Sequence, residues 1–75
     1  MEALIKFIED QLALATKYRG EPYFVHSFKC HAYGATLYAS YYAINNGDYD
    51  LSHKIDELWN NNYYEKFAKL ENSAG

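Results

Sequence analysis

Residues that could do metal or nucleophile chemistry cluster at His26, Cys30 and His31. His26 and Cys30 are four residues apart and would share one face of a helix, and His53 could supply a further nitrogen. Zinc sites need four such ligands, or three and a water molecule. The sequence lacks the closely paired cysteines or histidines that build many such sites, and a helix would turn His31 about 100° away from Cys30. We therefore predict no bound metal and no cofactor, with His26, Cys30 and His53 as weak candidate ligands.

Cys30 could instead be a nucleophile that uses a histidine as its base. His31 is its neighbour in sequence, and neighbours on a helix do not face each other. His26 could reach Cys30 only if residue 26 were already helical, and no acid that would orient its imidazole stands beside it in the sequence. A chain of 75 residues with a single cysteine in mid-helix is small for an enzyme, so we predict that the protein is not one.

The segment from Asn46 to Glu57 places acidic residues at several positions of a calcium-binding loop. The sixth position of that loop needs glycine for its sharp turn, and this sequence has Leu51 there. Acids are also favourable at the positive end of a helix, so we predict a turn that caps a helix and no calcium site. The same acids could form a face that binds a partner. The candidates for that face are Asp48, Asp50, Asp56 and Glu57.

Tyrosine is the most distinctive residue type, with nine copies among 75 residues. Its ring is apolar and its hydroxyl tolerates water, so tyrosines suit both the border of a small core and a protein interface. The first arrangement needs no function, whereas the second predicts an exposed aromatic patch that binds a partner or a second copy of the chain. The candidate interface residues are Tyr33, Tyr38, Tyr42 and Tyr64.

Length and charge exclude several classes of protein. Seventy-five residues allow a single small domain, residues 1–75. The net charge of −3 offers no basic patch, so we expect no direct binding to nucleic acid. No apolar run approaches the length of a membrane span, and the N-terminus has acids where a signal peptide needs bases. One cysteine cannot form the internal disulfides of small secreted domains. We therefore predict a cytoplasmic protein that does not bind membranes.

The first part of the chain predicts one helix and a connector. Residues 2–18 repeat apolar side chains at helical spacing, with charged residues on the opposite side. Residues 20–26 contain Pro22, which biases Glu21 towards an extended conformation. We therefore predict an extended connector over residues 20–26.

The rest of the chain predicts two further helices. Residues 27–45 are apolar, aromatic or small around most of a helix, which is typical of a helix contacted on two or three sides. Residues 51–71 form the last helix, either one helix or a pair divided at Asn60–Asn62, because asparagine is a poor helix former. The predicted fold is all-α, a small three-helix bundle around a largely buried central helix. The polar strip on that central helix consists of Lys29, Tyr33, Thr36 and Ser40.

These features predict a small non-catalytic protein-interaction module that binds a protein partner, or forms a homodimer, through an aromatic-rich surface. An alternative is an inhibitor, of the kind encoded by phages and mobile elements, whose acidic face occupies a nucleic-acid-handling protein of the host. A further alternative is a helical domain that binds a metal or another ligand.

Overall fold

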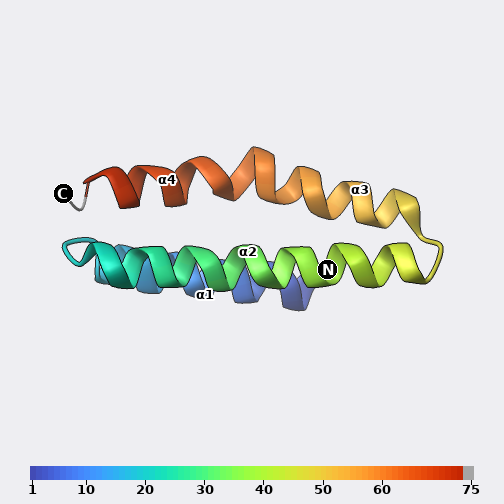
Figure 1. Ribbon diagram of the computed structural model, residues 1–75, viewed down its shortest axis with the longest axis horizontal. Coiled ribbons are helices and arrows are strands. Elements are labelled where there is room, and N and C mark those ends of the chain that lie inside the picture. The colour runs from blue at the N-terminus through green and yellow to red at the C-terminus, as the bar shows by residue number, and fades with distance from the viewer. Residues whose placement is uncertain (74–75) are drawn as a thin grey trace.

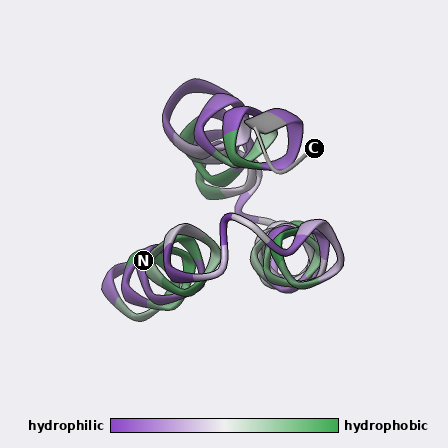
Figure 2. Ribbon diagram, turned by 90° about the vertical axis from the view of Figure 1, so that its left-hand side faces the viewer, coloured by the Kyte–Doolittle hydropathy of each residue, from purple (hydrophilic) through white to green (hydrophobic). Residues whose placement is uncertain are grey.

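The computed structural model describes residues 1–73, which form three helical rods. The rods are α1 (Glu2–Lys17), α2 (Pro22–Asn45) and a continuous third rod made of α3 (Tyr49–Leu58), the π-helical turn η1 (Trp59–Tyr63) and α4 (Tyr64–Ser73). The rods lie side by side along the long axis of the molecule (Figure 1) and form a triangle in cross-section (Figure 2). The predicted all-α three-helix bundle is confirmed. Within residues 1–73, no helix combines the length and apolarity that crossing a membrane requires.

The start of α2 corrects the predicted connector. Residues 22–26 are not extended but form the first turns of α2, with Glu21 as the residue that precedes the helix. Pro22 occupies the first helical position, where its fixed φ suits the helix and its missing N–H is not needed. Glu21 itself is extended, as its place before a proline requires, and its carbonyl accepts a hydrogen bond from the Val25 N–H at 3.1 Å. The helix therefore begins five residues earlier than Ser27, and His26 is helical.

Helix α2 contacts both other rods, but only one of its faces is buried. Thr36 and Ser40, which belong to the predicted polar strip, are buried in the bundle, and their hydroxyls are hydrogen-bonded there. Thr36 donates to the Ala32 carbonyl at 2.9 Å, and Ser40 shares a 2.7 Å hydrogen bond with Ser52 of α3. The other buried residues of this face are Val25, Ala32 and Ala43, so the face carries mainly small side chains. Most of the remaining large side chains of α2 are exposed and a few, such as Phe28, are half-buried, so α2 is less buried than expected.

A tight turn joins α2 to the third rod. Gly47 adopts a φ of +76°, a conformation that an Asn-Gly pair favours. Asp48 then caps α3, since its carboxylate accepts a hydrogen bond from the Leu51 N–H at 3.1 Å. The predicted capping turn is thus present, and α3 starts at Tyr49 rather than residue 51.

The predicted break at Asn60–Asn62 is a π-helical turn within an unbroken rod. Ile55, Trp59, Tyr63 and Phe67 are all buried although they are spaced four residues apart. In an α-helix each such step would rotate the side chain about 40° too far, so the row would leave the core. The wider π-turn absorbs this excess and keeps the row pointing inward.

The main core forms where this row meets the other two rods. The Phe67 ring stacks on Trp59 with centroids 5.6 Å apart. The Tyr63 hydroxyl donates to Glu9 of α1 at 3.1 Å, and burial together with this bond raises the pKa of Tyr63. The other buried members of the core are Ile8, Ala15, Val25 and Ala32.

The rods differ in length, which leaves part of the bundle uncovered. Helix α1 has 16 residues and α2 has 24, so α1 is roughly 12 Å shorter at 1.5 Å per residue. Helix α1 ends and α2 begins at the same end of the molecule, and the N-terminus lies well short of the turn that joins α2 to α3 (Figure 1). The C-terminal part of α2 and the start of α3 therefore form a two-helix end.

Deleting Asn61 should remove the extra residue of the π-turn and leave a continuous α-helix. The inward residues would then follow Trp59 at intervals of three and four, the regular α-helical spacing. We expect the variant to stay folded, with a free energy of unfolding within about 0.5 kcal/mol of the wild-type value. Chemical denaturation followed by the fluorescence of Trp59 measures it.

Inserting an alanine after Asn61 is the matched control. The insertion turns Phe67 and the rest of α4 about 100° further around the rod, so the core row is displaced. The insertion should lower the free energy of unfolding by about 2 kcal/mol or more. A deletion as damaging as the insertion would contradict the role assigned to η1.

Candidate functional site

The first candidate site is an apolar groove at the two-helix end, with a volume of about 310 Å³. We call it the end groove. Tyr38 and Tyr42 of α2 form one wall, Leu51 and Ile55 of α3 form the other, and Met1 closes it at the end of α1. The groove thus lies where α1 would continue if it were longer. Its lining is mainly carbon, so it favours an apolar ligand.

Two predicted interface tyrosines stand at the end groove. Tyr38 and Tyr42 are one helical turn apart and stack with ring centroids 6.4 Å apart and an interplanar angle of 24°. They are 74% and 62% exposed, so the rings are free to contact a partner. Tyr41, between them in sequence, is 63% exposed and lies outside the groove.

The predicted acidic residues surround α3 and do not share one face. Asp48 caps the helix, and Asp50 follows in its first turn. Asp56 lines a hollow beside Tyr33. Glu57 lines a different hollow near Met1. These four acids, with Lys54 as the one lysine among them, give this end of the molecule an excess of negative charge.

The second candidate site is a hollow of about 380 Å³ between α2 and η1, which we call the π-turn pocket. Tyr33 and Trp59 form its aromatic wall, with ring centroids 5.5 Å apart. Tyr64 lies on the α4 side, where the ammonium group of Lys29 sits 5.7 Å from the centre of its ring. Cys30 also lines this pocket. The four predicted interface tyrosines therefore divide into two pairs at two sites.

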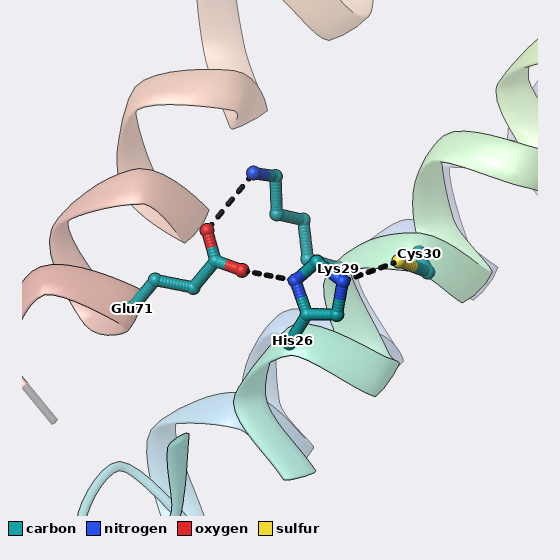
Figure 3. A network of polar contacts seen from close by, with 4 residues as sticks. All are labelled: His26, Lys29, Cys30 and Glu71. Atoms are coloured by element: carbon teal, nitrogen blue, oxygen red, sulfur yellow. Dashed lines mark hydrogen bonds and ion pairs between the residues drawn. The ribbon is translucent and has the colours of Figure 1, made fainter. Parts of the chain in front are cut away.

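A chain of polar contacts runs along the edge of the π-turn pocket (Figure 3). Cys30 Sγ lies 3.4 Å from His26 Nε2, and His26 Nδ1 lies 2.5 Å from Glu71 Oε1. The second oxygen of Glu71 accepts a hydrogen bond from Lys29 Nζ at 2.9 Å. Helix α2 supplies the thiol, the imidazole and the ammonium group, and α4 supplies the carboxylate.

The order of these contacts fixes the roles of the imidazole nitrogens. An ionised carboxylate can only accept, so Nδ1 must carry the proton that it shares with Glu71. When the ring is neutral, Nε2 is therefore the acceptor, and it faces the thiol of Cys30. Lys29 and then His26, by hydrogen bonding to Glu71, lower the pKa of that carboxyl below its ordinary value of 4.5. Glu71 in turn raises the pKa of Lys29.

The weak metal candidates do not gather. His53 pairs with Glu57 of its own helix at 3.1 Å, on the third rod, while His26 and Cys30 are in contact on α2. His31 bonds to Gln11 of α1 at 3.2 Å. Among the described residues, no group of three or more histidine, cysteine, aspartate or glutamate side chains is arranged to hold a metal ion.

Sequence reasoning missed Glu71, which lies 45 residues after its partner His26. It also started α2 too late, so that His26 lay outside the helix. Pro22 at the first helical position was the available signal for the earlier start. No local signal in the sequence pairs residues that are so far apart along the chain. Comparison of the chain with protein-family models, with curated proteins and with solved structures found no match.

Replacing Glu71 with glutamine should destabilise the protein at neutral pH by about 1 kcal/mol, because it removes a charge-assisted contact between α2 and α4. The lowered pKa of Glu71 means that its stabilisation is complete above pH 4.5 and is lost as pH falls through the lowered value. The difference between variant and wild type should therefore shrink in acid. Denaturant unfolding from pH 7 down to pH 3 measures this.

The matched control is Glu65→Gln, which removes the same charge from an exposed position on the same helix. It should change stability by less than about 0.5 kcal/mol at neutral pH. A Glu71→Gln difference that persisted unchanged at pH 3 would show that the ionised carboxylate is not its source.

Proposed function

We propose that this protein is a binding module that takes an amphipathic helix of a protein partner, with basic residues beside its apolar stripe, into the end groove. The observation that carries the proposal is the uncovered two-helix end, whose groove is apolar and bordered by exposed aromatic rings. The proposal requires no catalysis, and we place the protein in the cytoplasm, in keeping with its single cysteine.

The shape of the groove supports a helical partner. Along the rest of the bundle, α1 covers the seam between α2 and the third rod (Figure 2). The end groove continues that seam beyond the first residue of α1. The uncovered length of roughly 12 Å corresponds to about two helical turns. An amphipathic helix that presents its apolar stripe would complete the bundle in the same way as α1 does.

Charge supports a basic partner over a second copy of the chain. The segment from the last turns of α2 to the end of α3 contains four carboxylates and one lysine, Lys54. Two copies that met through this end would bring like charges together, which is unfavourable at an interface. Basic residues beside the apolar stripe of a partner helix would instead be attracted. A nucleic-acid-handling protein with such a helix is the partner class of the inhibitor alternative.

Binding is tested with a labelled helical peptide that carries one leucine stripe flanked by lysines. Tyr42→Ser should weaken its binding to the protein about tenfold, since exposed aromatic rings often dominate such interfaces. Tyr41→Ser is the matched control because it alters the same residue type with the same exposure on the adjacent position of α2. It should leave the affinity within about twofold. Fluorescence anisotropy measures both.

A peptide with glutamates in place of the lysines should bind more weakly, and the difference should fall as salt rises. Sedimentation of the protein alone should show a monomer. Equal effects of Tyr41→Ser and Tyr42→Ser would contradict binding in the end groove. A stable dimer that Tyr42→Ser dissociates would replace the helical partner with a second copy.

A further inference from the structure

We propose that the π-turn pocket binds small disulfides that carry carboxylate groups and presents them to Cys30, which reacts with them to form a mixed disulfide. This inference concerns a different surface from the end groove and does not depend on it. It arises from a nucleophile, a base and an orienting acid that the fold brings into line beside a pocket.

The fold places an imidazole directly beside the thiol of Cys30. His26 Nε2, 3.4 Å from Sγ, is positioned to accept the thiol proton. Glu71 holds the other nitrogen, so the imidazole is fixed in the tautomer that can act as a base. Lys29 fixes Glu71 in turn. Each side chain in the series Cys30, His26, Glu71 and Lys29 is thus held by the next one. Cys30, the first of them, is exposed.

The pocket supplies the recognition. Tyr33, Trp59 and Tyr64 offer aromatic surface, and the volume of about 380 Å³ lies within the range of small-molecule sites. Its other lining residues include Lys29 and Asn60, which can donate hydrogen bonds to a carboxylate. Among the described residues no acid lines it, and Glu71 at its edge is engaged by Lys29 and His26. A neutral or anionic ligand therefore suits this pocket better than a cation does.

The reaction is thiol–disulfide exchange. His26 takes the proton of Cys30, and the thiolate attacks one sulfur of the bound disulfide. The new S–S bond forms at Cys30 as the original S–S bond breaks. The departing thiolate receives the proton from His26, so that one disulfide and one thiol give another disulfide and another thiol. The bound disulfide is the only oxidant that the step requires.

The single cysteine makes the test direct, since all reaction with thiol reagents occurs at Cys30. The probe is 5,5′-dithiobis(2-nitrobenzoate), an aromatic dicarboxylate disulfide, and the comparison probe is cystamine, a dicationic disulfide. We expect the folded protein to react with the dicarboxylate at pH 7 at least tenfold faster than N-acetylcysteine does. We expect its preference for the dicarboxylate over cystamine to exceed that of N-acetylcysteine, and its rate to saturate with probe concentration.

Variants distinguish the effect of the contacts that link Cys30, His26 and Glu71, which we call the relay, from the effect of the exposure of Cys30 alone. His26→Ala should lower the rate at pH 7 about tenfold and move the rise of rate with pH to higher pH, because the thiol loses its base. Glu71→Gln, a change at a positioning residue, should move the profile in the same direction by less. His31→Ala is the matched control, a histidine on the same helix that faces α1 rather than Cys30.

Circular dichroism verifies that each variant is folded. The exposure of the His26 side chain, 65%, makes unfolding by His26→Ala unexpected. A wild-type rate equal to that of N-acetylcysteine, or an unchanged pH profile in His26→Ala, would overturn the relay. A preference for the dicarboxylate probe no greater than that of N-acetylcysteine would overturn the assigned ligand class.

Discussion

The structure depends on one constraint, the need to keep four residues spaced by four on a single side of the third rod. Ile55, Trp59, Tyr63 and Phe67 supply most of the large buried side chains, because the facing side of α2 offers mainly alanine, threonine and serine. A regular α-helix would carry the row out of the core. The π-helical turn at Trp59–Tyr63 corrects the rotation, and the core is complete only with that turn in place.

The same turn builds the π-turn pocket and the relay beside it. Trp59 and Asn60 belong to the turn and line the pocket, while Glu71 follows Phe67 by four residues and so lies on the side of α4 that faces α2. With Phe67 turned inward, Glu71 reaches His26 and Lys29 at the start of α2. Isolated π-turns often occur at functional sites, and here the turn links the packing of the core to the contact between Glu71 and the start of α2.

The sequence was sufficient to predict three helices but not the contacts between them. Apolar periodicity predicted three helices, and the Asn60–Asn62 stretch located the irregularity, because both signals are local. The burial of Thr36 and Ser40 could not be predicted from polarity, since it depends on which face of α2 meets the other rods; Ser40 has its partner, Ser52, on another helix, and Thr36 bonds within α2 to Ala32. Glu71 could not be assigned to His26 for the same reason. The start of α2 was misjudged because Pro22 restrains the residue before it and also begins a helix, and only the first effect was considered.

Both candidate sites arise because the other helices do not cover the whole of α2. A chain of this size has few elements with which to bury the sides of a 24-residue helix. The face of α2 towards the core takes the small residues, so the large aromatic ones remain near or at the surface, where α1 ends early and where η1 widens the rod. At the first place the result is an apolar groove, and at the second it is a pocket that also holds a thiol, an imidazole and an ammonium group. The lengths of the helices and the π-turn therefore divide the exposed tyrosines between an apolar groove, which takes Tyr38 and Tyr42, and a hollow, which takes Tyr33 and Tyr64.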